Sequence, residues 1–281
     1  MKDAGGSFFV IVDVLCTSQR IPKGEDMFVT QNYIVASALD EAYEWNQKPK
    51  STVLGGCGWL KMGRRAMSNA IDLSALGLNQ ITETEDCFEL GAMVTLRQME
   101  THEGLAAYFG DCIAASVRQI VGVQFRNGAT IGGSIWGRFG FSDPLTLFLA
   151  LGAQVVLYQA GIVALSDFVH MPYDRDILTA IRLPKHGQKA VYLSHRAAAT
   201  DFPVLAVAVC ETAEQRVAAV GARPMRAERV VGSVDEAAPA FAERCAEEEL
   251  TFSSNLRGSA EYRTHLCRVL VRRAVQALKE A

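Results

Sequence analysis

The sequence of 281 residues lacks the short motifs on which several large enzyme classes depend. It contains no Gly-x-Ser-x-Gly elbow, no Walker lysine, no His-Glu-x-x-His pair and no Gly-x-Gly-x-x-Gly turn. Serine hydrolases, P-loop NTPases, zincins and Rossmann dehydrogenases each need one of these arrangements to place a nucleophile, a phosphate, a zinc ion or a dinucleotide. These four mechanisms are therefore disfavoured.

Metal-ligand spacing is also missing from the seven cysteines and five histidines. No two cysteines form a Cys-x-x-Cys pair, which argues against the compact spacing of most zinc and iron–sulfur sites. Scattered cysteines in odd number indicate free thiols and a reducing cytoplasm. We expect no metal ligand and no catalytic base in this chain. The histidines are interpreted as packing or surface residues: His102, His170, His186, His195 and His265.

Long apolar runs and an excess of one charge are absent as well. The 28 Lys and Arg residues are scattered among 31 Asp and Glu residues, and the net charge of −3 gives no electrostatic reason to expect nucleic acid. No uncharged stretch reaches the roughly 18 residues of a membrane span. The apolar run before Cys16 is interrupted by Asp13, which argues against a signal peptide. Residues 1–26 are therefore interpreted as an extension of unknown role.

Two glycine-rich segments are the most informative residues that the chain does contain. They are Val53-Leu54-Gly55-Gly56-Cys57-Gly58-Trp59-Leu60 and Ala129-Thr130-Ile131-Gly132-Gly133-Ser134. Glycine permits positive φ and close approach of a ligand, so successive N–H groups of such a turn can converge on an anion. One glycine-rich turn is common for steric reasons alone. Two of them predict a bound dinucleotide.

Two helix starts can be recognised beside these segments. Thr95 with Gln98 three residues later forms a capping box. Asp143 followed by Pro144 places an N-cap acid before a proline in the first turn, and this helix is expected to end at Gly152. The second glycine segment and Asp143 are therefore expected around one loop that leaves a strand and enters this helix.

Several side chains near the segments have two interpretations. Trp136, Phe139 and Phe141 follow the second segment closely and would either pack its loop or shield an aromatic cofactor. Arg138 would be either a solvated charge or a contact to phosphates. Cys57 is interpreted as a small loop residue, because no adjacent Lys, Arg or His is available to lower its pKa.

Together these residues resemble the FAD-binding medium subunit of the molybdenum hydroxylases, the family that includes xanthine dehydrogenase and carbon monoxide dehydrogenase. In that family a Thr/Ser-x-Gly-Gly-Asn segment is followed, nine residues after its Asn, by an Asp, and both lie near the flavin. Ser134 and Asp143 have this spacing. The family's first FAD loop, Ala-Gly-Gly-Thr-Asp-Leu, is similar to residues 55–60.

The resemblance extends over most of the chain. Residues 91–96 are similar to the family's Gly-Ala-x-Val-Thr-Leu segment, while residues 221–227 and 257–263 are similar to segments of its C-terminal domain. Two departures concern side chains: Ser134 replaces the Asn, and the Cys-Gly-Trp of residues 57–59 replaces Gly-Thr-Asp. Contacts made through the backbone are still implied at both places.

The resemblance implies that FAD is bound without a covalent bond. The backbone N–H groups of residues 53–60 would hold its pyrophosphate, Asp143 would accept a hydrogen bond from the ribityl chain or ring, and Leu178 would lie beside the ring. The four other site residues would surround the ribityl chain and phosphate: Thr130, Gly132, Gly133 and Ser134.

The order of predicted elements, βα units followed by strands and then helices, favours an α+β fold. The resemblance implies a two-lobed FAD-binding domain of the vanillyl-alcohol oxidase/molybdopterin dehydrogenase type, followed by a C-terminal α/β domain. We expect the boundary near Pro172, because a run of strands follows it. The predicted parts are an extension at 1–26, lobes at about 27–80 and 81–172, and a C-terminal domain at 173–281.

The resemblance implies an FAD-carrying electron-transfer subunit of a xanthine dehydrogenase-like complex. In such complexes a molybdopterin-binding large subunit hydroxylates the substrate, a [2Fe–2S] small subunit relays electrons, and FAD passes them to NAD(P) or another acceptor. Two alternatives remain open: a free-standing FAD oxidoreductase and a flavin-free scaffold subunit. The yellow colour of a flavoprotein would separate the last of these from the others.

Overall fold

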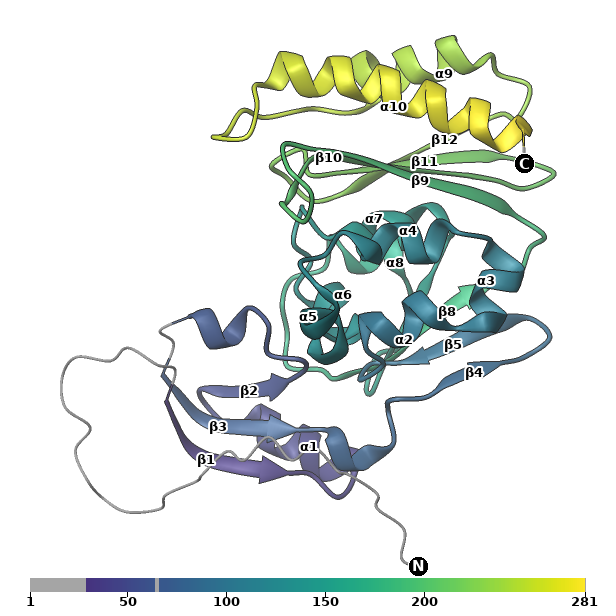
Figure 1. Ribbon diagram of the computed structural model, residues 1–281. Coiled ribbons are helices and arrows are strands. Elements are labelled where there is room, and N and C mark those ends of the chain that lie inside the picture. The colour runs from purple at the N-terminus through teal and green to yellow at the C-terminus, as the bar shows by residue number, and fades with distance from the viewer. Residues whose placement is uncertain (1–28, 64–65, 281) are drawn as a thin grey trace, which may run out of the picture.

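The structure, a computed structural model, describes residues 29–63 and 66–280 (Figure 1). Three β-sheets follow one another along the chain, and each has helices of its own, so the predicted α+β class is confirmed. The predicted N-terminal extension lies outside the described residues. Within the described part of the chain, no helix is both long enough and apolar enough to cross a membrane.

The first lobe is a small parallel sheet with one helix against it. Its strands are ordered β1-β3-β2, and the helix α1 lies between β1 and β2 in sequence. Its buried core includes Ala42, Ile71 and Leu73, together with Ile177 from a later part of the chain. Its elements are β1 (Thr30–Val35), α1 (Leu39–Gln47), β2 (Ser51–Leu54), η1 (Leu60–Met62), β3 (Met67–Asp72) and η2 (Ser74–Leu76).

The second lobe is a five-stranded antiparallel sheet covered by short helices. Its strand order is β4-β5-β8-β6-β7. Its strands are β4 (Ile81–Glu83), β5 (Cys87–Gly91), β6 (Gln154–Leu157), β7 (Gly161–Ala164) and β8 (Leu178–Pro184). Its helices are α2 (Leu96–Thr101), α3 (Glu103–Phe109), α4 (Cys112–Arg118), α5 (Val123–Gly128), α6 (Ile131–Trp136), α7 (Asp143–Ala150) and α8 (Leu165–Phe168).

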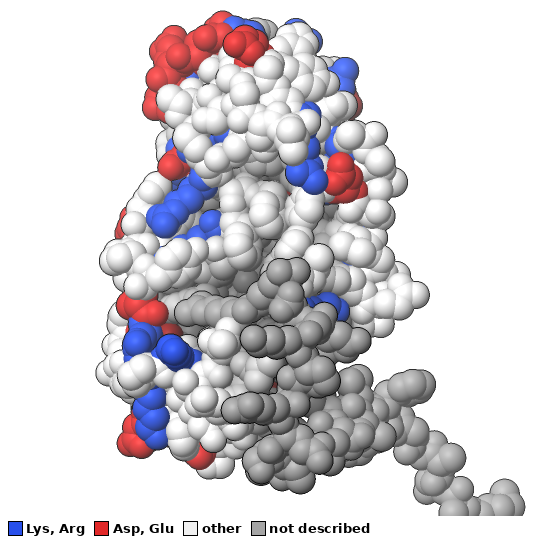
Figure 2. All heavy atoms as spheres, turned by 90° about the vertical axis from the view of Figure 1, so that its left-hand side faces the viewer, with Lys and Arg blue, Asp and Glu red and all other residues white. Residues whose placement is uncertain are grey.

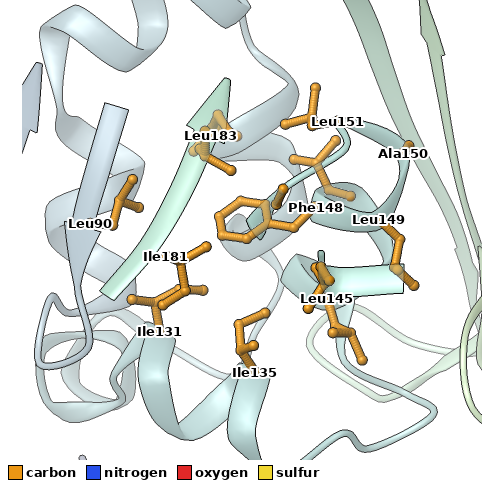
Figure 3. Packing of buried hydrophobic residues seen from close by; sticks show 14 of the residues in the cluster. Leu90, Ile131, Ile135, Leu145, Phe148, Leu149, Ala150, Leu151, Ile181 and Leu183 are labelled. Atoms are coloured by element: carbon orange, nitrogen blue, oxygen red, sulfur yellow. The ribbon is translucent and has the colours of Figure 1, made fainter. Parts of the chain in front are cut away.

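The core of the second lobe lies between its sheet and its helices. Figure 3 shows the ring of Phe148 on α7 pointing toward Ile181 and Leu183 of β8. All three side chains are fully buried. Every residue of α7 is buried, so this mostly apolar helix lies inside the molecule.

Strand β8 follows the boundary that the sequence predicted near Pro172, yet it lies at the centre of the second lobe's sheet. It pairs antiparallel with β5 on one side and with β6 on the other. Strand pairing over about 90 residues cannot be recognised from local pattern, which is why β8 was grouped with the strands after it. We therefore propose that the second lobe extends to Pro184 and that the C-terminal unit begins at Lys189.

The C-terminal unit is an antiparallel meander with the order β12-β11-β10-β9. Its sheet lies between α10 on one face and helices α4 and α7 of the second lobe on the other (Figure 1). The apolar strand β10 is buried along nearly its whole length, as expected for a strand covered on both faces. The elements are β9 (Lys189–Arg196), β10 (Pro203–Glu211), β11 (Arg216–Gly221), β12 (Glu228–Gly232), α9 (Ala238–Glu243), η3 (Arg244–Glu249) and α10 (Ala260–Glu280).

Charged side chains are distributed unevenly over the face drawn in Figure 2. Asp and Glu side chains gather at the top, over the C-terminal unit, whereas the coloured Lys and Arg side chains are spread along the face. Glu243 and Glu247 both form ion pairs with Arg268 of α10. These ion pairs neutralise part of the acidic charge of the C-terminal unit.

The two predicted helix starts have different outcomes. The capping box at Thr95 is confirmed: its Oγ1 accepts from the N–H of Gln98 at 3.1 Å, and the Gln98 side chain accepts from the N–H of Thr95 at 2.8 Å. The prediction of Asp143 as the N-cap of α7 is wrong by one residue. Ser142 is the N-cap, accepting from the N–H of Leu145 at 3.4 Å, and Asp143 is the first helical residue.

The segment at 257–263 has a structural role that centres on Arg263. This side chain is 1 % exposed, and its guanidinium donates to the carbonyl oxygens of Val204 at 2.9 Å and Ser253 at 2.7 Å. It also donates to the carbonyl oxygen of Gly258 at 2.5 Å and to Oδ1 of Asn255 at 2.6 Å. One buried arginine therefore ties α10 to β10 and to the loop before α10.

Arg263→Met is expected to lower the free energy of unfolding by about 3 kcal/mol, because it leaves buried carbonyl oxygens without a donor. Urea denaturation followed by circular dichroism measures this change. The matched control is Arg273→Met on the exposed face of the same helix, which is expected to change stability by less than about 0.5 kcal/mol. Equal stability of the two variants would contradict the role assigned to Arg263.

Candidate functional site

The two glycine segments, which the sequence identified separately, lie against each other in the structure. The N–H of Gly56 donates to Oγ1 of Thr130 at 3.2 Å, although the two residues are 74 positions apart. The same Oγ1 accepts from the N–H of Gly133 at 3.2 Å. A Cβ added at Gly55 would lie 2.7 Å from Thr130 Oγ1 and 3.6 Å from the Cα of Gly133. Backbone therefore approaches backbone where the first lobe meets the second.

The first segment is an open loop. It leaves β2 and contains Cys57 at φ +54°, in the left-handed region. Within the described residues, the N–H groups of Cys57, Gly58 and Trp59 donate to no acceptor. Alternation of left- and right-handed residues turns successive N–H groups toward one point and forms an anion-binding nest. This loop can therefore hold a phosphate.

The second segment is not the turn that the sequence predicted but the first turn of α6, with Thr130 as its N-cap. The N–H groups of Ile131, Gly132, Gly133 and Ser134 all have acceptors already: Gly132 donates to Ala92 O at 2.9 Å, Ser134 donates to Thr130 O at 3.1 Å, and Gly133 donates to Oγ1 of Thr130. A Cβ at Gly132 would lie 2.4 Å from Ala92 O, whereas one at Gly133 would meet only Thr130 Oγ1 at 3.2 Å. Gly132 thus serves packing, and Gly133 leaves room beside the first loop.

Asp143 lies beside this helix start, at the first residue of α7. Its N-terminal neighbour Ser142 donates from Oγ to the carbonyl oxygen of Ser134 at 3.3 Å. Asp143 is 3 % exposed, and its Oδ1 accepts from Nη2 of Arg196 at 2.7 Å and from the hydroxyl of Tyr192. Burial raises the pKa of the Asp143 carboxyl, while Arg196 and Tyr192 act in the opposite direction.

Arg196 and Tyr192 are residues of this site that sequence reasoning missed. Both lie on β9 of the C-terminal unit, and neither belongs to a motif with fixed spacing from Asp143. The only signal was an acid in a helix start that had no basic partner nearby in sequence. Burial, followed by the neighbouring Asp143 carboxylate, raises the pKa of Tyr192 well above its usual value, so its hydroxyl remains a donor.

Four aromatic residues, Trp59, Phe139, Phe141 and Phe202, form what we call the aromatic cluster. Trp59 of the first loop stacks on Phe202, with ring centroids 5.3 Å apart, and meets Phe141 edge-on at 5.5 Å. Phe139 and Phe141 are parallel at 5.2 Å. The predicted alternative of loop packing therefore describes Phe139 and Phe141, and the cluster joins the first loop to the C-terminal unit.

A cavity of about 450 Å³ borders the aromatic cluster. The loop between α6 and α7 forms one side of it, and Phe202, Met225 and Arg257 of the C-terminal unit form another. The guanidinium of Arg257 lies over the ring of Phe202 at 4.8 Å and pairs with Asp201 at 3.3 Å. The second lobe and the C-terminal unit thus line an open space with aromatic rings and arginine side chains, and the aromatic cluster separates it from the first loop.

Among the residues that the structure describes, Arg138 pairs with no acid, and it is buried rather than solvated. It is 3 % exposed and lies over the rings of Phe168 at 3.8 Å and Tyr173 at 4.6 Å. Its Nη1 donates to the carbonyl oxygen of Met171 at 2.7 Å. Burial lowers the pKa of Arg138. Trp136, at 5.4 Å from the guanidinium, belongs to the same cage, so these two residues fix the loop between α6 and α7.

Two other predicted site residues have mainly structural surroundings. Burial, and to a smaller extent Asp72, raises the pKa of Cys57, whose Sγ donates to the carbonyl oxygen of Gly55 at 3.3 Å. Its interpretation as an unreactive loop residue agrees with this. Leu178 begins β8, is 5 % exposed and pairs with Leu157 of β6. These contacts do not involve a flavin, and the contact of Leu178 with the ring stays a prediction. Among the described residues, no group of His, Cys, Asp and Glu could hold a metal ion.

Comparison with known proteins places this geometry in a family. Residues 27–186 match the FAD-binding domain in molybdopterin dehydrogenase, and residues 189–278 match the CO dehydrogenase flavoprotein C-terminal domain. The nicotine 6-hydroxylase medium subunit of Paenarthrobacter nicotinovorans is 30 % identical over 230 residues, covering 74 % of this chain and 81 % of that protein. The carbon monoxide dehydrogenase medium chain of Afipia carboxidovorans is 31 % identical over 233 residues, with the same coverage.

Solved structures show the same fold. The reconstituted CO dehydrogenase from Oligotropha carboxidovorans superposes with a TM-score of 0.80 at 25 % identity, covering 90 % of this chain and 99 % of that chain. The quinoline 2-oxidoreductase from Pseudomonas putida 86 gives a TM-score of 0.79 at 20 % identity, covering 90 % and 98 % of the two chains. With its two family domains in order and its glycine loops in contact, the chain belongs to the FAD-binding medium subunits of the molybdenum hydroxylases, of the CO dehydrogenase type, and is a subunit of an oxidoreductase.

Proposed function

We propose that this chain binds FAD without a covalent bond and passes electrons through it from [2Fe–2S] clusters of a partner subunit to NAD(P) or another acceptor. The observation that carries the proposal is the first glycine loop. Its N–H groups at Cys57, Gly58 and Trp59 lack acceptors within the described residues, and the loop faces the Cβ-free position Gly133. A loop of this kind suits a pyrophosphate.

The side chains that depart from the family pattern leave this backbone site intact. Cys57 directs its Sγ back to the carbonyl oxygen of Gly55, and Ser134 directs its Oγ to the carbonyl oxygen of Thr130 at 3.1 Å. Neither side chain is needed for the N–H groups of the first loop to act as donors. The residues present therefore fit the pyrophosphate part of FAD through the backbone.

The other proposed site residues differ in what they contribute. Because the N–H groups of Gly132, Gly133 and Ser134 are already bonded, these residues are proposed to surround the ribityl chain and phosphate without donating to them, with Gly133 leaving the space, while Thr130 fixes the two segments together. Asp143 is proposed to accept a hydrogen bond from the ribityl chain or ring. Leu178 is proposed to lie beside the ring. When bound, FAD supplies one-electron acceptance and hydride transfer, and the protein sets its orientation and potential.

The partners follow from what this chain does not carry. Since the described residues hold no group of metal ligands, the molybdopterin and [2Fe–2S] centres are proposed to belong to a large and a small partner subunit of a xanthine dehydrogenase-like hetero-oligomer. The relatives named above as medium subunit and medium chain support a multi-subunit complex. A cytoplasmic location is proposed because all six described cysteines are free thiols.

A flavin-free scaffold subunit is the second candidate function, and Trp59 is the observation that favours it. The indole replaces an acidic residue of the family pattern and stacks on Phe202 beside the glycine loop. The absorbance of the purified chain between about 350 and 500 nm distinguishes the candidates, because a flavin absorbs there and the polypeptide does not. The free-standing oxidoreductase is disfavoured, since both domains of the chain are accounted for by the medium-subunit family.

Gly133→Val is expected to reduce FAD binding at least tenfold while the chain remains folded. Gly133 has helical backbone angles, which valine can adopt, but the methyl groups of valine would fill the space beside the first loop that the phosphate is proposed to occupy. Fluorescence titration with FAD measures the affinity. The matched control is Gly104→Val in the first turn of α3. A Cβ at Gly104 would lie 3.1 Å from the side chain of His102, the N-cap of α3, much as a Cβ at Gly133 would lie near the N-cap Thr130. Unchanged FAD affinity in a folded Gly133→Val would contradict the proposed phosphate site.

Acid precipitation of the FAD-loaded chain is expected to release all of the flavin into the supernatant. The proposed ring region between Thr130 and Asp143 contains no His or Cys, and the pKa of Cys57 is raised, which makes its thiol a poor nucleophile. Absorbance of supernatant and pellet after centrifugation gives the result. Flavin colour retained in the pellet would show a covalent bond.

The isolated chain is expected to hydroxylate none of the substrates of its complex. It is expected to show diaphorase activity, in which NADH or NADPH reduces an artificial dye through FAD, because this reaction needs only orientation and potential. Dye reduction and substrate hydroxylation are measured with the chain alone and after addition of the partner subunits. Hydroxylation by the chain alone, with molybdenum and iron absent by elemental analysis, would overturn the electron-carrier function.

A further inference from the structure

A buried ion pair connects the proposed flavin site to the C-terminal unit. Arg196 at the end of β9 donates from Nη2 to Oδ1 of Asp143 at 2.7 Å, and the two side chains are 6 % and 4 % exposed. Arg196 is held by two further bonds, from Nη1 to the carbonyl oxygen of Asp201 at 2.5 Å and from Nε to Oγ of Ser194 at 3.2 Å. The hydroxyl of Tyr192 also donates to Asp143. Four residues of the C-terminal unit thus determine where this carboxylate points.

Both donors use the same oxygen of Asp143. Because Arg196 and Tyr192 both donate to Oδ1, neither of them occupies Oδ2. Two donors on one oxygen fix the rotation of the carboxylate, and charge-assisted bonds of this kind are short and directional. Among the described residues no donor reaches Oδ2, so the arrangement orients the second oxygen and leaves it to accept another hydrogen bond.

The charge of Asp143 depends on the same two residues. A carboxylate that is removed from water becomes protonated unless an opposite charge and hydrogen-bond donors compensate. Within the described part of the chain, the titratable and charged groups that act on Asp143 are Arg196 and Tyr192, both from β9, against the opposing effect of burial. Without these two residues the pKa of Asp143 would be higher, so the carboxyl would become protonated and neutral at a higher pH.

We propose that Arg196 and Tyr192 are positioning residues for the flavin, which hold Asp143 ionised and oriented so that Oδ2 accepts the hydrogen bond from the ribityl chain or ring. This inference rests on the proposed function and deepens it. It assigns part of the cofactor site to the C-terminal unit, although neither residue belongs to a glycine segment. Lysine cannot replace Arg196, because one ammonium group cannot reach the three acceptors that the planar guanidinium serves.

The inference is tested by FAD titration of the full chain at about pH 6 and pH 8.5. Arg196→Met is expected to weaken FAD binding roughly 10- to 100-fold at pH 6 and less at pH 8.5. The sign follows because loss of the guanidinium raises the pKa of Asp143, so that the acceptor is protonated as the pH falls. Tyr192→Phe is expected to shift affinity in the same direction by a smaller factor. The unaltered chain is expected to bind FAD equally well at both pH values.

A double variant separates positioning from simple structural support. Arg196→Met leaves a buried, unpaired carboxylate and lowers the melting temperature, and adding Asp143→Asn removes that charge and is expected to restore stability. FAD affinity of the double variant is expected to stay at the level of Asp143→Asn alone and to lose its pH dependence. If affinity returned together with stability, the ion pair would be structural and the inference would be wrong.

Arg216→Met is the matched control for loss of a buried arginine in the same sheet. Arg216 is 1 % exposed and pairs with Glu211 at 2.5 Å. It begins β11, whereas Gly221, which packs on Thr146 of α7, ends that strand. The control is expected to lower stability without making FAD binding depend on pH. If the unaltered chain binds FAD and Arg196→Met binds it with the same affinity at both pH values, the inference is wrong and the proposed function stands. If the unaltered chain binds no FAD, both the proposed function and the inference are wrong.

Discussion

Backbone-to-backbone contact at glycine is the constraint on which the arrangement of the three units depends. A Cβ at Gly56 of the first lobe would lie 1.9 Å from the carbonyl oxygen of Gly128 in the second. A Cβ at Gly140 of the second lobe would lie 2.1 Å from the carbonyl oxygen of Met225 in the C-terminal unit. No side chain fits at either place without movement of the main chain. Gly56, which belongs to a predicted cofactor segment, therefore also joins two of the units, and Gly140, which lies outside both segments, joins the third.

The C-terminal unit completes the site from the other side. Its β11 ends at Gly221, where a Cβ would lie 2.1 Å from Oγ1 of Thr146 on α7, and its Phe202 forms one wall of the aromatic cluster. The segment at 221–227, noted in the sequence only for its family resemblance, thus packs against α7 and the loop before it. Burial of α7 between two sheets explains why its first residue, Asp143, needs a partner from the second of them.

The parts of the fold that the sequence predicted are those that local chemistry determines. The capping box at Thr95 needs residues only three positions apart, so it can be recognised from local sequence. What could not be predicted depends on tertiary packing: the central position of β8, the six-residue helix α6 in place of a turn, and the pairing of Arg196 with Asp143. The N-cap at Ser142 was missed because serine and aspartate have similar capping preference, and local sequence does not choose between them.

The stacking of Trp59 on Phe202 gives the protein a natural optical reporter. The chain has three tryptophans, and the other two lie elsewhere: Trp45 under the ammonium of Lys48, and Trp136 beside Phe168. Trp59 is 44 % exposed and is the one that spans the joint between the first loop and the C-terminal unit. A change in the separation of these two parts would therefore alter its emission, so the integrity of this contact can be followed without any attached label.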